Sequence, residues 1–146
     1  MVKQFPILYS FRRCPYAIRA RLALLVSKQT VEIREELLKD KPVDFINKSP
    51  SKTVPCLILN DQVIDESLDI MIWALEINDP EKWLETTDTE FDLINLIDHE
   101  FKPLLDKTKY ATRFPDEDFY KNRENALKIL KEVDERISGK NLSKNR

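Results

Sequence analysis

The sequence has 146 residues, of which 42% are hydrophobic and 34% charged, and its formal net charge is −2. These values are typical of one globular domain, or of a small domain with part of a second, and they exclude a disordered chain. The nearly neutral charge argues against a nucleic-acid partner, and the lack of a long apolar run or a signal-peptide core argues against a membrane partner and export, so we expect a cytoplasmic protein.

The first part of the chain predicts one α/β unit with the element order βαβ, α, ββα. Pro15 is typical of a helix start, because its missing N–H would be unpaired there. The alternation of Val31 and Ile33 predicts a strand, and Asn60-Asp61 predicts the turn of a hairpin. The expected elements are a strand at 3–10, a helix at 15–28, a strand at 30–37, a short helix at 41–50, hairpin strands at 54–59 and 62–66, and a helix at 67–77.

Apolar residues at helical spacing predict which faces of these helices point toward a core. The predicted core-facing residues are Ile18, Leu22, Leu25 and Val26 in the first helix, and Leu68, Ile72 and Leu75 in the last. Arg19 and Arg21 are most simply exposed residues of the first helix.

Beyond Pro80 the pattern becomes helical throughout. We expect residues 1–78 to form the first domain, 79–86 a linker, and 87–146 a partial all-helical domain with two long helices. Asp116 is the expected N-cap of the second long helix. The predicted buried faces consist of Ile94, Ile97, Phe101 and Leu104 in the first of these helices, and Ala126, Leu130, Val133 and Ile137 in the second.

The two cysteines suggest different roles. Cys14 and Cys56 lie 42 positions apart without the spacing of metal ligands, so no metal is expected. Cys14 falls at the edge of the first helix, where unpaired N–H groups, the helix dipole and Arg12 and Arg13 favour a reactive thiolate. Ala17 excludes a C-x-x-C dithiol, so a thiolate that attacks a disulfide would need a second thiol from a small cosubstrate. The alternative is a structural cysteine.

Two further stretches have both a structural and a functional interpretation. Pro55 precedes an apolar strand and by base rate would follow a trans peptide bond, while Cys56 is expected as a small buried core residue. Ser67 is a good N-cap residue for the helix that follows. Alternatively, Ser67 and the helix N-terminus would bind a ligand carboxylate, and Glu66 an adjacent ammonium group.

Four motifs together resemble the glutathione S-transferase family: "RRCPYAIRARLAL", "KDKPVDF", "TVPCLIL" and "ESLDI". They are most similar to its cysteine-type branch, the omega-like and related bacterial members, and "DHEFKPLLDKTKYATRFP" resembles the start of that branch's helical second domain. The resemblance implies a thioredoxin-like N-terminal domain, followed here by part of an all-α domain. It also implies glutathione as cosubstrate.

The resemblance assigns roles on the side of the thiol. It implies that Cys14 forms a mixed disulfide with glutathione, and that Tyr16 is the aromatic residue beside the thiol. Lys41 would pair with the glycyl carboxylate of glutathione.

The remaining implied roles lie in the "VP" and "ES" motifs. The backbone of Val54, held by a cis Pro55, would hydrogen-bond the cysteinyl part of glutathione, and Glu66 and Ser67 would bind its γ-glutamyl end. One departure is Lys52, which replaces the family's usual glycine two residues before "VP" and suggests a turn of different shape.

The leading functional hypothesis is a glutathione-dependent thiol transferase or reductase, which acts on a small or protein disulfide and forms a homodimer. The alternative is a non-enzymatic binding or scaffold protein that keeps the fold, as some family members do. An incomplete second domain favours the scaffold, whereas the combination of Cys14, Lys41, Glu66 and Ser67 favours the enzyme.

Overall fold

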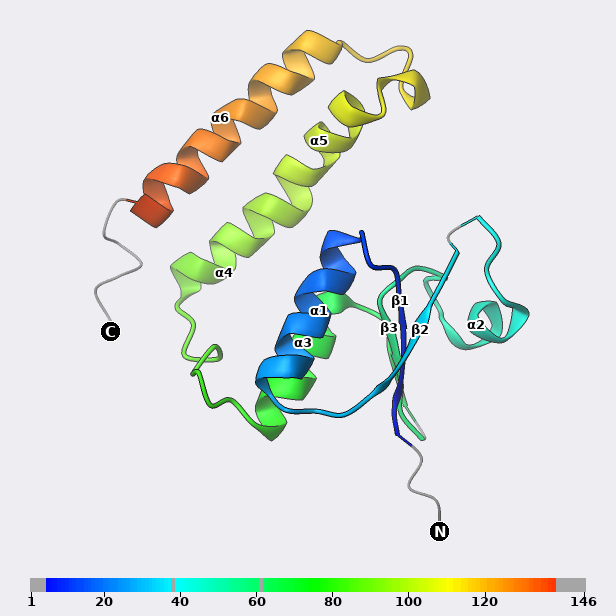
Figure 1. The fold of residues 1–146 in the computed structure, drawn as a ribbon. Coiled ribbons are helices and arrows are strands. Elements are labelled where there is room, and N and C mark those ends of the chain that lie inside the picture. Colours follow the sequence, from blue (N-terminus) through cyan, green and yellow to red (C-terminus); the bar gives the residue numbers. More distant parts are fainter. Residues whose placement is uncertain (1–4, 38, 61, 139–146) are drawn as a thin grey trace. The chain divides into compact units, whose positions relative to one another are not determined.

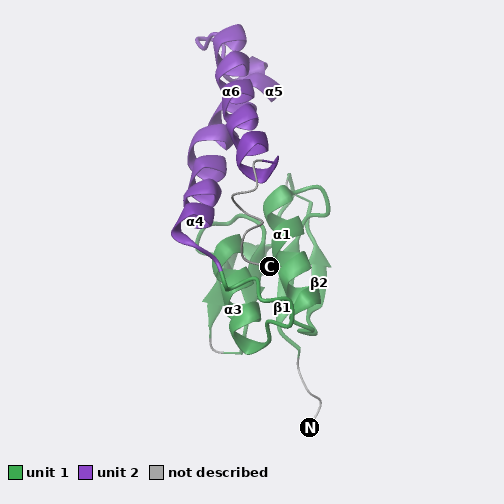
Figure 2. Cartoon of the chain, turned by 90° about the vertical axis from the view of Figure 1, so that its left-hand side faces the viewer, with its two compact units in different colours: residues 1–85 green, residues 86–146 purple. Residues whose placement is uncertain are grey.

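The chain divides into two compact units, Met1–Glu85 and Thr86–Arg146 (Figure 2). The computed structural model describes residues 5–37, 39–60 and 62–138. In these ranges no helix combines the length and the apolar character that a membrane span requires.

Unit 1 is built on a four-stranded mixed sheet, and its element order confirms the predicted βαβ, α, ββα (Figure 1). The strands lie in the order β2-β1-β3-β4; β2 runs parallel to β1, and β3 and β4 run antiparallel to their neighbours. Leu8 pairs with Ile33 on one side and with Leu57 on the other. The strands are β1 (Ile7–Ser10), β2 (Glu32–Glu35), β3 (Cys56–Ile58) and β4 (Val63–Ile64), and the helices are α1 (Pro15–Val26), α2 (Val43–Lys48) and α3 (Ser67–Ile77).

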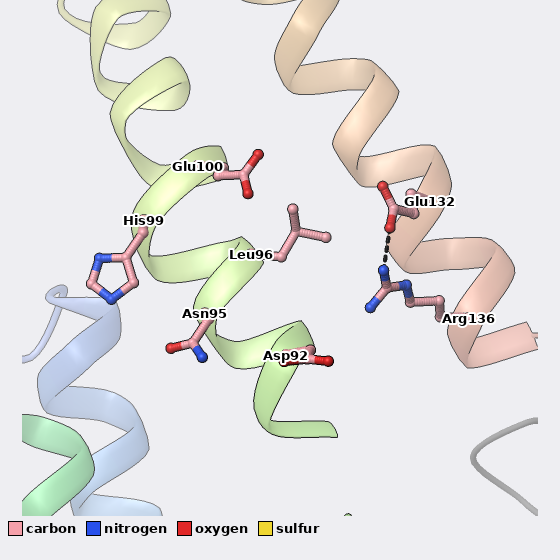
Figure 3. Close-up of a pocket in the computed structure, with 7 residues that line it drawn as sticks. All are labelled: Asp92, Asn95, Leu96, His99, Glu100, Glu132 and Arg136. Carbon is pink, nitrogen blue, oxygen red and sulfur yellow. Dashed lines mark hydrogen bonds and ion pairs between the residues drawn. The ribbon is translucent and has the colours of Figure 1, made fainter. Parts of the chain in front are cut away.

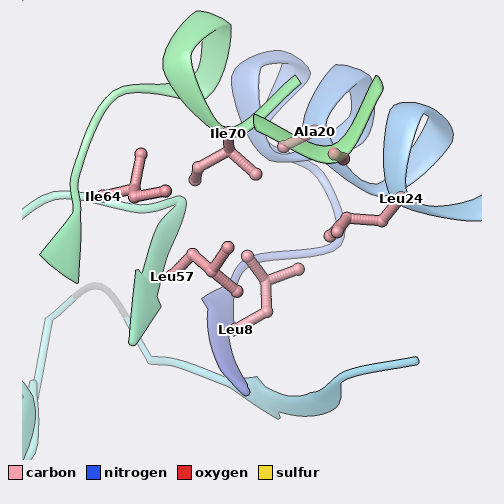
Figure 4. Close-up of a cluster of buried hydrophobic side chains, with 7 residues drawn as sticks. Leu8, Ala20, Leu24, Leu57, Ile64 and Ile70 are labelled. Carbon is pink, nitrogen blue, oxygen red and sulfur yellow. The ribbon is translucent and has the colours of Figure 1, made fainter. Parts of the chain in front are cut away.

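Helices cover both faces of the sheet. Successive side chains of a strand point in opposite directions, so each strand contributes to both faces. Leu8 and Leu57 point toward α1 and α3, whereas Tyr9 and Cys56 pack with Phe45 of α2. Figure 1 shows α1 and α3 on one side of the sheet and α2 on the other. Figure 4 shows the core under α1 and α3, which consists of Leu8, Ala20, Leu24, Leu57, Ile64, Ile70 and Ala74.

The predicted core face of α1 is wrong. Ile18, Leu22 and Leu25 are 40%, 48% and 74% exposed. The buried residues are instead Ala17, Ala20, Ala23 and Leu24, which follow the same helical spacing on another face. Small side chains allow α1 to approach α3 and the sheet closely, whereas a ranking by side-chain hydrophobicity favours the larger residues. In α3 the prediction holds for Leu75, which is buried, while Leu68 and Ile72 are half-buried.

The full sequence has a single glycine, and among the described residues lysines occupy the left-handed backbone positions. Lys28, Lys52 and Lys82 have φ values of 58°, 57° and 58°. At the end of α1, the Lys28 N–H donates to Leu25 O at 3.1 Å and the Gln29 N–H donates to Leu24 O at 2.9 Å, which is a Schellman motif with lysine where glycine is preferred.

Unit 2 begins with a nearly continuous helical rod. Thr87 and Glu90 form a reciprocal capping box before α4 (Asp88–Asn95), a π-helical segment follows at Leu96–Phe101, and α5 (Lys102–Lys109) continues the rod. Pro103 lies in the first turn of α5 and has no N–H to donate to the preceding turn, which accounts for the local change of helix type.

The second long helix of unit 2 is α6 (Phe119–Ser138), which packs along α5 after a short 3-10 turn at Ala111–Arg113. Its N-cap is Asp118 and not the predicted Asp116, since Asp118 Oδ1 accepts the Lys121 N–H at 3.0 Å. The predicted buried face holds for part of its length. Ala126 is buried, whereas Leu130 and Ile137 are 42% and 60% exposed.

Candidate active site

Cys14 occupies the N-cap of α1, as its place before Pro15 predicts. Its backbone is extended, with φ −76° and ψ 119°, and its carbonyl accepts the Ile18 N–H at 2.9 Å, which begins the helix. The thiol is half-buried and donates toward the carbonyl oxygen of Val54, with an Sγ–O distance of 3.8 Å. The structure thus brings together two predicted site residues that are 40 positions apart in the chain.

Arg21 holds the turn that carries Cys14. Its Nη1 donates to Ser10 Oγ at 2.6 Å and its Nη2 donates to the carbonyl oxygen of Arg12 at 3.1 Å. Arg21 is half-buried, so its interpretation as a simply exposed helix residue is wrong. Two hydrogen bonds from one charged guanidinium fix the end of β1 and the residues just before the thiol.

The loop before β3 carries Val54 and Pro55. The Val54–Pro55 peptide bond is cis, as the family resemblance implies, and the base-rate expectation of a trans bond is wrong. Lys52 adopts the left-handed conformation that glycine prefers, with φ 57°. The Lys52 carbonyl accepts a hydrogen bond from Lys41 Nζ at 2.5 Å, which places the predicted Lys41 beside this loop.

Asp65 joins the same loop to the start of α3. Its Oδ1 accepts from Ser49 Oγ at 2.9 Å, and its Oδ2 accepts from the Ser51 N–H at 2.5 Å. Because Asp65 directly precedes Glu66, these bonds fix the entry to α3 relative to the residues before Val54. Sequence reasoning missed Asp65.

Glu66 and Ser67 lie at the N-terminus of α3, one residue away from the predicted cap. Glu66, not Ser67, is the N-cap, and Ser67 is the first helical residue. Glu66 is exposed, whereas Ser67 is 2% exposed and its Oγ accepts a hydrogen bond from Arg19 Nε at 2.9 Å. The Arg19 guanidinium also lies 4.9 Å from the centre of the Tyr16 ring. Arg19 is therefore half-buried and bonded, contrary to its interpretation as simply exposed.

Cys56 differs from Cys14 in its surroundings. Its side chain is fully buried, which confirms its expected place in the core. Burial, together with the negative charge of Asp65 and a hydrogen bond to it, raises the pKa of the Cys56 thiol to about 12. Cys56 is therefore a neutral core thiol at physiological pH, and Cys14 is the thiol with access to solvent.

Unit 2 contains a cavity of about 500 Å³ between α6 and the rod formed by α4 and the π-helical segment (Figure 3). Glu132 and Arg136 of α6 form an ion pair at its edge, and Asp92 and Glu100 approach from the rod. The chain's one histidine, His99, also lines it. None of the predicted site residues belongs to this cavity, which is dominated by carboxylates and an internal ion pair.

Contacts join the predicted site residues of unit 1 in two groups. Cys14 contacts Val54, Lys41 contacts the loop before Val54, and Ser67 is linked to Tyr16 through Arg19. The elements that hold them are the N-termini of α1 and α3, with the β3-proximal loop between them. These elements carry a thiol, helix-terminal N–H groups, an ammonium and a carboxylate.

Comparison with known proteins supports the family that the motifs indicate. The family described as glutathione S-transferase, N-terminal domain, matches residues 8–83. Glutathione S-transferase U22 of Arabidopsis thaliana is 35% identical over 72 residues, which are 49% of this chain and 33% of that protein. The match thus spans about a third of the length of this curated relative.

Solved structures share the fold over most of the chain. Glutathione S-transferase unclassified 2 from Bombyx mori matches with a TM-score of 0.76 at 14% identity, covering 93% of this chain and 68% of that one. Glutathione transferase Omega 3C from Trametes versicolor matches with a TM-score of 0.75 at 18% identity, covering 94% and 64%. These matches confirm the predicted fold, a thioredoxin-like N-terminal unit followed by a helical region. Since the family match covers half of the sequence, the chain belongs to the glutathione S-transferase family.

Proposed function

We propose that this protein is a glutathione-dependent thiol transferase in which Cys14 forms the mixed disulfide with glutathione. The observation that carries the proposal is the position of the Cys14 thiol at the N-cap of α1, facing the Val54 carbonyl of the loop before β3. A thiolate in this place can attack a disulfide without a separate general base.

The reaction takes place in two balanced exchanges. The Cys14 thiolate attacks the glutathione sulfur of a mixed disulfide R–S–SG, so that the Cys14–SG bond forms and the thiolate RS⁻ leaves. The thiolate of a second glutathione then attacks Cys14–SG, which releases oxidised glutathione and regenerates the Cys14 thiolate. A reducing compartment such as the cytoplasm would supply this second glutathione.

The proposed binding residues for glutathione are Lys41, Glu66, Ser67, Val54 and Tyr16. Lys41 has three donors and uses one on the Lys52 carbonyl, which leaves capacity for the glycyl carboxylate. The exposed Glu66 carboxylate suits the γ-glutamyl ammonium, and the Val54 backbone beside cis Pro55 suits the cysteinyl amide.

The second thiol must come from outside the chain. Cys56 is fully buried, has a pKa raised to about 12, and packs against Tyr9 and Phe45 on the sheet face opposite α1 and α3. Ala17 occupies the position where a C-x-x-C protein has its resolving cysteine. A small thiol cosubstrate therefore fits this site better than an internal disulfide.

The proposal also includes the predicted domains, the second substrate and the oligomeric state. Residues 1–78 would bind glutathione, 79–86 would link this domain to the next, and 87–146 would be part of a helical domain. The second substrate would be a small or protein disulfide, and the chain would act as a homodimer.

The proposal is tested by incubating the protein with oxidised glutathione at several pH values and locating adducts by peptide mass spectrometry. We expect rapid modification of Cys14 alone, which persists below pH 7 and is reversed by reduced glutathione. Cys14→Ser should abolish the adduct, and Cys56→Ala should retain it. Slow modification of both cysteines, rising only above pH 8, would overturn the proposal.

A further inference from the structure

We propose that Arg19 is a positioning residue for glutathione, which fixes the Ser67 hydroxyl as a hydrogen-bond donor to the α-carboxylate of the γ-glutamyl group. This inference rests on the proposed function. It adds Arg19 as a residue that acts on the ligand through Ser67. It also adds a prediction about which part of the ligand that residue controls.

The geometry connects α1 to the first residue of α3. Arg19 Nε donates to Ser67 Oγ at 2.9 Å, across 48 positions of sequence. The guanidinium lies 4.9 Å from the centre of the Tyr16 ring, which limits its freedom to turn away from Ser67. Ser67 is only 2% exposed, so water competes little for its hydroxyl.

The direction of this hydrogen bond determines what Ser67 can do. A serine hydroxyl has one donor and two acceptor positions. When a charged Arg19 N–H occupies an acceptor position, the Ser67 hydrogen must point away from the guanidinium, and it is left to donate to another group. Without Arg19, the hydroxyl could rotate and accept from a ligand ammonium as readily as it donates to a carboxylate.

The place of Ser67 in α3 makes a carboxylate the fitting partner. As the first helical residue, Ser67 has a backbone N–H without an acceptor inside the helix. A carboxylate oxygen at this end would accept from both the hydroxyl and helix-terminal N–H groups, with the positive charge of Arg19 behind them. The exposed Glu66 next to Ser67 would then accept from the neighbouring ammonium.

Arg21 shows that this role is specific to Arg19. The two arginines lie two residues apart on α1, but Arg21 bonds Ser10 and the Arg12 carbonyl and so holds the thiol-bearing turn. Arg19 bonds the residue proposed to bind the γ-glutamyl group. Loss of Arg19 should therefore affect ligand selectivity, whereas loss of Arg21 should affect the thiol.

The test measures the binding of two probes by calorimetry. One is S-methylglutathione, which cannot form a disulfide, and the other is the same molecule with hydrogen in place of the γ-glutamyl α-carboxylate. The full chain is compared with Arg19→Gln, Arg19→Lys, Ser67→Ala and the double variant Arg19→Gln/Ser67→Ala. Arg123→Gln, an exposed arginine of α6, is the matched control.

We expect Arg19→Gln and Ser67→Ala each to weaken binding of S-methylglutathione ~10- to 100-fold, the range of one charge-assisted hydrogen bond. Binding of the decarboxylated probe should change less than ~2-fold, and the double variant should be no weaker than Ser67→Ala alone. Arg19→Lys keeps the charge without the Nε donor, so it should not restore the preference for the carboxylate. Arg123→Gln should behave as the unchanged chain.

Two contrary results can be told apart. If the unchanged chain binds S-methylglutathione but Arg19→Gln and Arg19→Lys weaken both probes equally, or weaken neither, the role of Arg19 is overturned and the proposed function stands. If the unchanged chain binds neither probe, the proposed function fails and the inference fails with it.

Discussion

The Sγ atom of Cys14 lies 3.8 Å from the carbonyl oxygen of Val54, which connects the N-terminus of α1 with the loop before β3. Arg21 fixes the first of these segments, and Asp65 fixes the second. The thiol is therefore held between two anchored pieces of backbone.

The two cysteines should differ in reactivity across the neutral pH range. Because burial and Asp65 raise the pKa of Cys56 to about 12, this thiol stays protonated and enclosed between pH 6 and pH 9. We expect iodoacetamide to modify Cys14 only, as measured by peptide mass spectrometry. Cys56 should react only when urea unfolds the chain. Equal labelling of both in the folded protein would contradict the burial described here.

Replacing Arg21 should loosen the turn that carries the thiol. Arg21→Gln removes bonds to Ser10 Oγ and the Arg12 carbonyl, and should lower the free energy of unfolding by about 2 kcal/mol. The rate of Cys14 alkylation in the folded variant should move toward the rate measured for the urea-unfolded chain. Urea unfolding and alkylation kinetics measure the two effects, with Arg123→Gln as the control. A variant that matches the unchanged chain in both would show that Arg21 is dispensable.

Lys28→Gly should stabilise unit 1. Lys28 adopts φ 58° in the Schellman motif after α1, where a side chain is unfavourable and glycine is not. After subtraction of the extra entropy of glycine in the unfolded chain, a gain of about 0.5–1 kcal/mol remains. Thermal or urea unfolding measures it, and Lys28→Ala, which keeps a Cβ, should give no comparable gain. A loss of stability on Lys28→Gly would speak against the left-handed conformation.

The capping box before α4 should make unit 2 sensitive to acid. The backbone and side-chain hydrogen bonds of Thr87 hold the pKa of Glu90 below its ordinary value of 4.5. A lowered pKa means that the contribution of Glu90 to stability is complete above pH 4.5 and is lost as the pH falls through its folded value.

Glu90→Gln should therefore reduce the melting temperature at pH 7, and the difference from the unchanged chain should shrink toward pH 3. Glu100→Gln, which replaces an exposed carboxylate of the same unit outside the capping box, is the control for the loss of one negative charge. A difference for Glu90→Gln that is constant with pH would exclude this electrostatic explanation.

The fold of unit 1 was largely predictable because its signals are local. The alternation of Val31 and Ile33, the Pro15 helix start and the hairpin signal after β3 depend on neighbouring residues, and the observed elements β2, α1 and the β3–β4 pair confirm them. Asp61 of the predicted turn lies outside the described residues. The buried face of α1 was not predictable in this way, since Ala17, Ala20 and Ala23 have the same spacing as larger apolar residues. Only the close packing of α1 with α3 selects the alanines.

In the candidate site too, local motifs were predictable, whereas contacts between distant residues were not. The motifs identified Cys14, Val54 and Ser67 because their types and order resemble a known family. Sequence reasoning missed the role of Arg19 because its partner, Ser67, is 48 positions away. Neither Arg19 nor Arg21 has an acidic residue four positions away on α1, and this weak signal of a tertiary partner could have corrected their interpretation as exposed residues.

The most direct test of the account is the steady-state turnover of the mixed disulfide between glutathione and 2-mercaptoethanol, with reduced glutathione as the second thiol. We expect the unchanged chain and Cys56→Ala to catalyse this exchange, and Cys14→Ser to lower the rate to that of the uncatalysed reaction. Turnover by Cys14→Ser at the rate of the unchanged chain would contradict this expectation, because the exchange would then not pass through the thiol at the N-cap of α1.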